Sequence, residues 1–257
     1  MKTIAISGKG GTGKTTLAAF IVRLLRERGD GSVLAVDGDP NVNLNDLLGV
    51  RLEDTIGAIR EDMRDQGGAG IPAGMSKQQF LEYKIQSSVV EATGFDLLAM
   101  GRPEGPGCYC YANTLLRDIL KTLSSNYAYV VIDNEAGMEH LSRRTVQLID
   151  HLLIVSDPTL RGIRAAGRIS RLLRELDTRV RDKRLVLNRT RGPVGVPDDI
   201  ARAIEDEGLE LLHTVPWDEG LLRLDQSEDS IFSLPDNSAS CQAVDRLLDT
   251  LVARGDK

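Results

Sequence analysis

The sequence is poor in aromatic residues and in cysteine, and it contains no long apolar run. Phenylalanine, tryptophan and tyrosine together make up 4% of the 257 residues, whereas apolar residues as a whole make up 41%. We therefore expect a mostly aliphatic core, large enough at this length to stabilise one domain that covers residues 1–257. Because no apolar run approaches the ~20 residues of a membrane-spanning helix, we expect no membrane partner.

Charge and the amino-terminal segment exclude two further classes of protein. The 38 acidic residues outnumber the 32 lysines and arginines, which gives a net charge of −6. The molecule as a whole is therefore no general binder of polyanions, and a nucleic-acid partner is not expected. The chain enters a strand pattern and a glycine-rich loop at once, which leaves no room for a signal peptide. With only three cysteines, these features predict a cytoplasmic protein in a reducing compartment.

The glycine-rich loop has the spelling of a phosphate-binding loop. It follows the apolar run at residues 3–6 and precedes apolar residues at helical spacing. Glycines let backbone N–H groups approach phosphates, and the helix N-terminus adds a positive dipole end. In this pattern Lys14 neutralises the β- and γ-phosphates of ATP and the Thr15 hydroxyl binds Mg²⁺. The loop consists of Gly8, Lys9, Gly10, Gly11, Thr12, Gly13, Lys14, Thr15 and Thr16.

Three of these glycines also spell the weaker fingerprint of a dinucleotide site. Gly8, Gly10 and Gly13 fit G-x-G-x-x-G, and Asp37 lies about where a ribose-binding acid is expected. A dinucleotide site, however, has no use for Lys14 and Thr15. The sequence therefore favours a nucleoside triphosphate.

Strands alternate with helices along the rest of the chain. Apolar runs predict strands at residues 3–6, 33–36, 95–100, 129–132, 151–155, 184–187 and 209–215. Helical spacing predicts helices at residues 52–63, 112–123, 160–176, 197–207, 219–226 and 239–252, and residues 80–90 fit either state. This alternation predicts an α/β fold, a mostly parallel twisted sheet with helices on both faces. Functional residues are then expected at the carboxyl ends of the strands.

Three acidic residues follow two of the predicted strands. Asp37 and Asp39 come after residues 33–36, and Asp133 comes after residues 129–132. A single acid at a strand end is often only a turn former or a helix cap, but three beside one phosphate-binding loop favour catalysis. Asp133 has the position of a Walker B aspartate, which holds Mg²⁺ through its water shell. The sequence therefore predicts a Mg²⁺-dependent ATPase.

Lys9 gives the loop a second lysine. The form Gly-Lys-Gly-Gly-x-Gly-Lys-Thr-Thr resembles the deviant Walker A motif of the MinD/ParA/nitrogenase-iron-protein ATPases. In that family the extra lysine reaches the nucleotide of the other subunit, so the resemblance implies a homodimer that sandwiches two ATP molecules. Residues 37–40 resemble the family's first switch, in which the second aspartate orients the attacking water. The resemblance thus implies catalytic roles for Lys9, Lys14 and Asp39.

Further nucleotide contacts are implied by the same resemblance. Residues 133–138 resemble the second switch, in which Gly137 would supply the N–H that senses the γ-phosphate. Asn188 resembles the family's adenine-binding asparagine. Pro216 and Asp218 match a second base-contacting segment. Trp217, between them, either packs near the base or covers the core.

Two cysteines form a Cys-x-Cys pair, Cys108 and Cys110. In extended backbone, residues i and i+2 point to the same side, so both thiols can face one ligand. A bland alternative is two small apolar residues in a loop. Two thiolates do not complete a tetrahedral site, but two chains related by a two-fold axis supply four, which suit Zn²⁺, Ni²⁺, Cu⁺ or an Fe–S cluster. We expect Ni²⁺ or Zn²⁺ at the dimer interface.

The surrounding residues narrow the resemblance. Residues 101–113 and 133–140 look like signatures of the CooC family, ATPases that mature nickel in carbon monoxide dehydrogenase, with relatives that serve acetyl-CoA synthase. The resemblance implies an ATP-dependent metallochaperone with one of these nickel enzymes as its client. Cys241 is distant in sequence and is expected to be a core residue.

Two other functions stay open. One is a redox ATPase that carries an Fe–S cluster, as nitrogenase iron protein does. The other is a positioning ATPase of the MinD or ParA kind, which binds no metal cargo. Residues 161–191 contain eleven basic and three acidic residues. This basic stretch fits a solvated helix face, a docking surface for an acidic protein or, least well, a DNA-binding surface.

Overall fold

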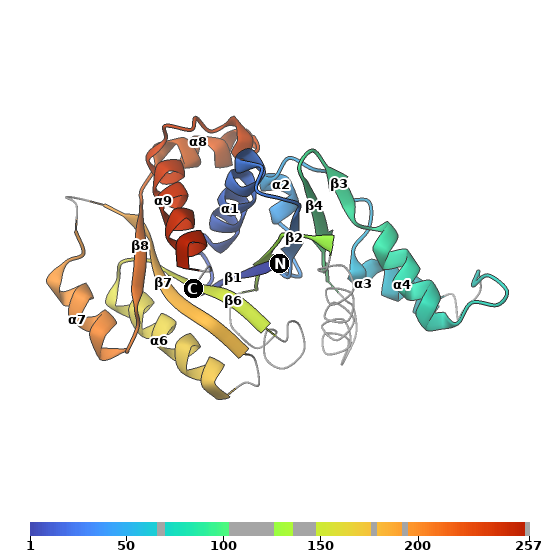
Figure 1. Ribbon diagram of the computed structural model, residues 1–257, viewed down its shortest axis with the longest axis horizontal. Helices are drawn as coiled ribbons and strands as arrows, with labels where there is room; N and C mark the ends of the chain where they lie inside the picture. The colour runs from blue at the N-terminus through green and yellow to red at the C-terminus, as the bar shows by residue number, and fades with distance from the viewer. Residues whose placement is uncertain (66–69, 103–125, 136–147, 176–178, 192–194, 255–257) are drawn as a thin grey trace.

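The computed structural model describes residues 1–65, 70–102, 126–135, 148–175, 179–191 and 195–254 (Figure 1). Within these ranges, eight strands form one sheet in the order β3-β4-β2-β5-β1-β6-β7-β8. All neighbouring strands run parallel except β3 and β4, which are antiparallel. The strands are β1 (Lys2–Gly8), β2 (Val33–Asp37), β3 (Val90–Ala92), β4 (Phe95–Ala99), β5 (Tyr129–Asp133), β6 (Leu148–Ser156), β7 (Arg179–Thr190) and β8 (Leu211–Pro216).

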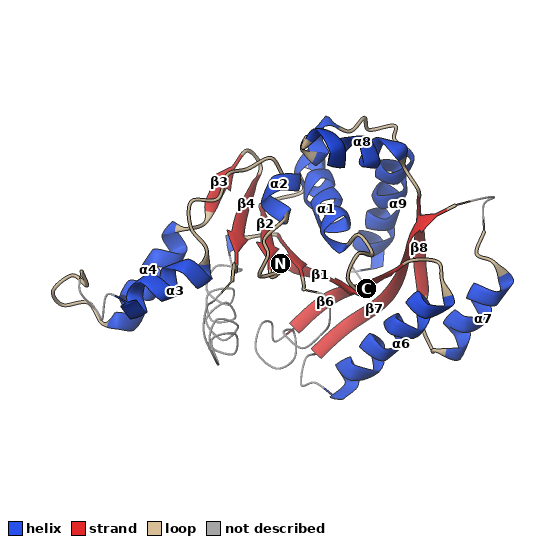
Figure 2. Cartoon of the chain, turned by 180° about the vertical axis from the view of Figure 1, so that it is seen from behind, coloured by secondary structure: helices blue, strands red, loops and turns tan. Residues whose placement is uncertain are grey.

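Helices cover both faces of this sheet, as Figures 1 and 2 show. One apolar core lies between the sheet and α1, α2, α8 and α9, and a second lies between the sheet and α3, α4, α6 and α7. The expected α/β fold, a mostly parallel sheet between helices, is therefore confirmed. The helices are α1 (Lys14–Arg28), α2 (Leu44–Leu47), α3 (Ile56–Asp65), α4 (Lys77–Ser87), α6 (Leu160–Glu175), α7 (Asp198–Asp206), α8 (Glu219–Ser227) and α9 (Ala239–Arg254), with a 3₁₀ turn, η2 (Ile231–Ser233).

The central strand β1 shows how the sequence builds two cores. Ile4 and Ile6 belong to the core under α1, while Ala5, between them, belongs to the core on the other face. Successive side chains of a strand point to opposite faces, so a strand that is covered on both sides is apolar throughout. Isoleucine, leucine, valine and alanine make up most of the buried residues, as the composition predicts.

Some boundaries differ from the predictions. The helix expected from residue 52 begins at Ile56, where the Thr55 hydroxyl accepts a hydrogen bond from the Ala58 N–H (3.2 Å). The ambiguous residues 80–90 fall mostly in α4, which starts at a capping box made by Ser76 and Gln79. β7 is longer than expected because polar residues continue it at both ends. The helix predicted at residues 112–123 lies outside the described residues.

Cys241 is 2% exposed and lies in the core under α1, as predicted. None of the helices in the described part of the chain is long and apolar enough to cross a membrane.

Candidate nucleotide site

The glycine-rich loop and the predicted acids meet at one edge of the sheet. β1 lies beside β5, with Ile6 opposite Asp133, and β2 lies on the other side of β5, with Asp37 opposite Asp133. Because parallel strands end at the same edge, Gly8, Asp37 and Asp133 converge there. The sequence prediction that these residues form one site agrees with this arrangement.

Two glycines of the loop occupy places that a side chain could not. A Cβ atom at Gly8 would lie 2.3 Å from the Val155 carbonyl oxygen of β6. Gly13 has a φ of 88°, and a Cβ atom there would lie 2.3 Å from Nδ2 of Asn188. The Thr12 hydroxyl donates a hydrogen bond to the Lys9 carbonyl (2.8 Å), which closes the loop. The backbone of β6 at Gly8 and the side chain of Asn188 at Gly13 thus restrict the conformation of the loop that precedes α1.

The two lysines of the loop differ in their exposure. Lys14, the first residue of α1, is 8% exposed, and its charge acts on the buried carboxylate of Asp133. Lys9 is exposed at the tip of the loop. Lys14 is therefore placed to act inside its own site, whereas the amine of Lys9 is accessible from outside.

Asp133 is the electrostatic centre of this edge. It is 1% exposed, and burial raises the pKa of its carboxyl from 3.8 to about 7, although a hydrogen bond from the Thr15 hydroxyl opposes the shift. The nearby carboxylates of Asp37 and Asp39 add to the rise, and Lys14 counteracts it. Oδ1 of Asp133 has no hydrogen-bond partner among the described residues.

This orphaned carboxylate oxygen fits a magnesium site. Mg²⁺ prefers hard oxygen ligands and keeps several water molecules, so one hydroxyl and one nearby carboxylate suffice on the protein side. The Thr15 hydroxyl and the Asp133 carboxylate are two such groups in direct contact. A cation here would also offset the burial of the Asp133 charge.

Asp37 organises the loop that follows β2. Its side chain is fully buried, and burial raises the pKa of its carboxyl. Oδ1 accepts a hydrogen bond from the Asp39 N–H (3.0 Å), and Oδ2 accepts from Asn43 N–H and Leu44 N–H (both 2.9 Å). Asp37 therefore holds the loop and the start of α2, a supporting role.

Asp39 lies in that loop and is only half-buried. Its Oδ1 accepts hydrogen bonds from the backbone N–H (2.9 Å) and the side-chain amide (3.1 Å) of Asn41. The Asp39 N–H donates to Asp37, which lies opposite Asp133, so Asp39 lies near the predicted magnesium site. The same loop contains Val42 at a φ of 45°, an unusual conformation for a β-branched residue.

A cavity of about 260 Å³ lies beside the loop, at the carboxyl ends of β7 and β8. It brings together the predicted base-contacting residues Asn188, Pro216 and Asp218. Trp217 also lines this cavity, with the Arg191 guanidinium 4.0 Å from its ring centroid. The remaining lining residues are Thr16, Arg189, Leu221, Leu222 and Asp225.

The side chain of Asp218 is held by three hydrogen bonds that the sequence does not predict. Its carboxylate accepts hydrogen bonds from Gly220 N–H (2.8 Å), Ser240 N–H (3.1 Å) and the Ser240 hydroxyl (2.6 Å). Although burial opposes it, these hydrogen bonds hold the pKa of Asp218 below its ordinary value. Asp218 thus joins the starts of α8 and α9 at the wall of the cavity.

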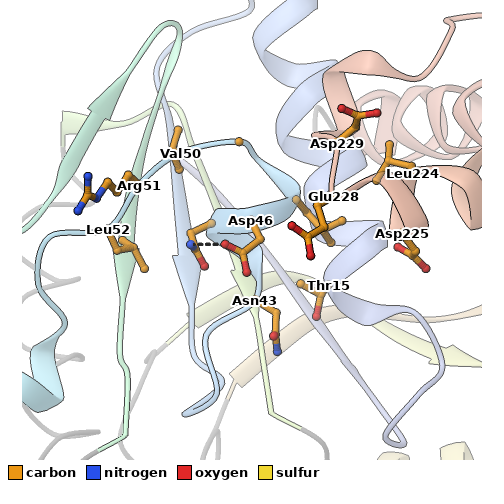
Figure 3. A pocket seen from close by; sticks show the side chains of 13 residues that line it. Thr15, Asn43, Asp46, Val50, Arg51, Leu52, Leu224, Asp225, Glu228 and Asp229 are labelled. Carbon is orange, nitrogen blue, oxygen red and sulfur yellow. Dashed lines mark hydrogen bonds between the residues drawn. The ribbon is translucent and has the colours of Figure 1, made fainter.

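A second, larger cavity was not expected from the sequence (Figure 3). It measures about 1020 Å³ and lies between the residues around α2 and the end of α8, and Thr15 also lines it. Its charged lining is predominantly acidic, because Asp46, Asp225, Glu228 and Asp229 line it against a single basic residue, Arg51. In the sequence, the acidic residues at 225–229 are the signal that could have indicated this cavity. The segment around α2 that forms its other side lies almost 180 positions earlier in the chain.

Several predicted site residues lie outside the described part of the chain. These are Gly137 and the two cysteines of the Cys-x-Cys pair, Cys108 and Cys110. Among the described residues, no group of three or more His, Cys, Asp and Glu side chains is arranged to hold a metal ion. The predicted four-thiolate site therefore stays a prediction.

The basic stretch at residues 161–191 lies mostly on α6 and β7. Arg161, Arg164 and Arg168 lie exposed along α6, whereas Arg171 forms an ion pair with Glu207 (2.5 Å). The stretch is thus partly neutralised by the protein itself. Its role as a solvated face or a docking surface stays a prediction.

Comparisons with known proteins identify the family of the chain. The family model described as the CobQ/CobB/MinD/ParA nucleotide binding domain matches residues 3–231. An uncharacterized ATP-binding protein of Methanocaldococcus jannaschii is 39% identical over 255 residues, which cover 97% of this chain and 98% of that protein. The carbon monoxide dehydrogenase accessory protein CooC of Rhodospirillum rubrum is 32% identical over 242 residues, which cover 90% and 89%.

A solved structure supports the same assignment at the level of the fold. The septum site-determining protein MinD of Pyrococcus horikoshii, complexed with Mg-ADP, has a TM-score of 0.72 at 23% identity, and the match covers 99% of this chain and 97% of that one. The family match spans both the glycine-rich loop and the two strands that carry Asp37 and Asp133. The chain therefore belongs to the CobQ/CobB/MinD/ParA family of nucleotide-binding domains and is a P-loop ATPase.

Proposed function

We propose that this ATPase is a metallochaperone that couples ATP to nickel insertion into carbon monoxide dehydrogenase or acetyl-CoA synthase. The observation that carries the proposal is the 32% identity to CooC over about nine-tenths of both chains. The Cys-x-Cys pair at Cys108 and Cys110 adds the chemistry that such a task requires, since thiolates bind nickel and zinc.

For nucleotide binding and hydrolysis, the proposal assigns the following roles to residues of the site. The loop N–H groups and Lys14 bind the phosphates, and Asn188 and Pro216 contribute to the base cavity. Bound Mg²⁺ offsets the charge of the β- and γ-phosphates, with Thr15 and Asp133 as the residues that hold it. Asp39 orients the attacking water beside them.

The exposure of Lys9 supports a two-subunit site. A buried lysine serves its own site, but the amine of Lys9 is free to approach a second molecule. In the proposed homodimer, Lys9 of each subunit reaches the nucleotide of the other and stabilises the closed sandwich. Gly137 senses the γ-phosphate in the same closed state.

The metal half of the proposal concerns the cargo. Cys108 and Cys110 of two subunits provide four thiolates around one Ni²⁺ or Zn²⁺ ion. Since the metal and ATP both act on the dimer, binding of one changes the affinity for the other. ATP binding or hydrolysis then controls release of the ion to the client enzyme.

Metal stoichiometry and mass, measured in parallel, test the shared site. We expect one ion per dimer in the wild type and loss of tight binding in Cys108→Ser and in Cys110→Ser, with ADP affinity unchanged. Cys241→Ala is the matched control, because Cys241 is buried in the core and should not affect the metal. Unaltered metal binding in both serine variants, or one full site on each monomer, would contradict the proposal.

A positioning ATPase is the second candidate, and the backbone similarity to MinD favours it. This candidate predicts a dimer that forms with ATP and binds no metal through cysteine. The same measurement separates the two, because it counts ions per dimer. A redox function is distinguished by visible absorption of an Fe–S cluster in protein purified without oxygen.

A further inference from the structure

The carboxyl end of β7 contains an irregularity next to the phosphate-binding loop. Leu187 pairs with Thr214 of β8, and Thr190 pairs with Pro216. Two residues of β7, Asn188 and Arg189, therefore lie opposite one residue of β8, which is the arrangement of a β-bulge. Bulges redirect side chains, and they are frequent beside active sites.

The bulge holds Arg189 in an unusual backbone conformation. Its φ is 58°, in the left-handed region that a side chain with a Cβ atom rarely adopts. The Arg189 N–H donates to Oδ1 of the preceding Asn188 (2.9 Å), which stabilises this conformation. As a result, both side chains extend from β7 toward the phosphate-binding loop.

The two side chains bind successive carbonyl groups of that loop. Nδ2 of Asn188 donates a hydrogen bond to the Thr12 carbonyl (2.8 Å). A guanidinium nitrogen of Arg189 donates to the Gly11 carbonyl (3.0 Å). Gly13 permits this approach, because a Cβ atom there would collide with Nδ2 of Asn188.

These contacts set the direction of the loop's N–H groups. In a planar trans peptide the C=O and the following N–H point in opposite directions, and the described chain has no cis peptide bond. When the Gly11 and Thr12 carbonyls point toward β7, the N–H groups of Thr12 and Gly13 point away from it. The Thr12 N–H also donates a long hydrogen bond to the Lys9 carbonyl (3.4 Å). An anion at the N-terminus of α1 requires inward N–H groups and outward carbonyls.

We propose that Arg189 is a positioning residue of the ATPase, which holds the Gly11 carbonyl outward so that the loop is preformed for phosphates. The inference rests on the assignment of Gly8–Thr16 as the phosphate site. Arg189 also lines the 260 Å³ cavity, so direct contact with the base is the competing role. The two roles differ in which part of the nucleotide depends on Arg189.

Affinities for ADP and for adenosine separate the two roles. Trp217, the single tryptophan of the sequence, lines the cavity and provides a fluorescence signal for both ligands. We expect Arg189→Ala to weaken ADP about tenfold, the range of one hydrogen bond to a charged group, and to leave adenosine unchanged. Arg189→Lys should recover part of the ADP affinity, because a lysine amine also donates to a carbonyl.

Arg191→Ala is the matched control. It removes the same charge two residues away, from a side chain that packs on Trp217, so any change it causes should affect ADP and adenosine alike. If Arg189→Ala weakens both ligands equally, or neither, the positioning role is wrong. Arg189→Lys and Arg189→Gln provide the same ratio should the alanine variant fail to fold. If the wild type binds adenosine but gains nothing from the phosphates of ADP, the phosphate site itself is wrong, and the inference is wrong with it.

Discussion

Replacing Asp133 by asparagine should stabilise the ligand-free protein at alkaline pH while impairing its use of Mg²⁺. The substitution keeps the shape of the side chain and an oxygen that accepts the hydrogen bond from Thr15, but it removes a charge from a site that is 1% exposed. In the proposed site, a Mg²⁺ ion held by Thr15 and Asp133 would compensate this charge. Without a ligand, this buried charge lowers the free energy of unfolding.

The size of the effect follows from the pKa of Asp133. A carboxyl whose pKa rises from 3.8 to about 7 on folding destabilises the ionised native state by about 4 kcal/mol. The native state binds more protons than the unfolded state across this interval, so stability falls as pH rises from about 4 to 7. Burial of the new amide N–H₂ group is counted at about 1–2 kcal/mol, which leaves a gain of about 2–3 kcal/mol at pH 8.

Thermal unfolding in chelator at pH 5 and pH 8 measures this gain. We expect Asp133→Asn to melt about 5–10 °C above the wild type at pH 8, and the gap to close or reverse at pH 5. Mg-ADP should then raise the melting temperature of the wild type more than that of the variant. Asp46→Asn is the control, since Asp46 is exposed and its solvation changes little on folding. A variant that melts below the wild type at pH 8, or that has the same pH dependence, would refute the reasoning.

Three further substitutions test the loop and its neighbours. Lys14→Ala leaves the phosphates without their buried counter-charge and should weaken ATP by about 100-fold or more in a binding assay; wild-type hydrolysis by this variant would contradict the assignment. Lys9→Ala should bind ATP within about threefold of the wild type, since Lys9 is exposed, yet lose ATP-driven dimerisation in mass measurements; normal dimers would argue against a cross-subunit role. Asp39→Ala should bind ATP but hydrolyse it at least about 100-fold more slowly, which traps a dimer; unchanged turnover would remove Asp39 from the water-orienting role.

Local patterns were enough to predict seven of the eight described strands and the place of the phosphate-binding loop, but not the short antiparallel strand β3. Alternate residues of β1 enter two cores, so an unbroken apolar run of this kind predicts a central strand. The glycine-rich run directly after it leaves little freedom for the loop, and the acids at strand ends follow from the rule that parallel strands share an edge. The convergence of Asp37 and Asp133 at one edge therefore follows from local patterns and this rule alone.

Tertiary contacts decided the features that the sequence did not reveal. The hydrogen bonds of Asp37 to Asn43 and Leu44 depend on the path of a six-residue loop, which no local pattern specifies. Likewise, the hydrogen bond between Asp218 and Ser240, which are 22 residues apart, joins the starts of two helices. The acidic cavity combines the segment after β2 with the end of α8, so its charge is invisible in either segment alone.

The central place of β1 has a consequence for the dynamics of the molecule. β1 is hydrogen-bonded on both edges, to β5 and β6, and both of its faces are covered. Its amides should therefore exchange with solvent deuterium only through global unfolding, the slowest class of opening. The loop at residues 38–43, which includes the exposed residues Asn41 and Asn43, should exchange by local opening. We therefore expect nucleotide entry and release to require opening of the loop at residues 38–43 only, while β1, which leads into the phosphate-binding loop, stays closed.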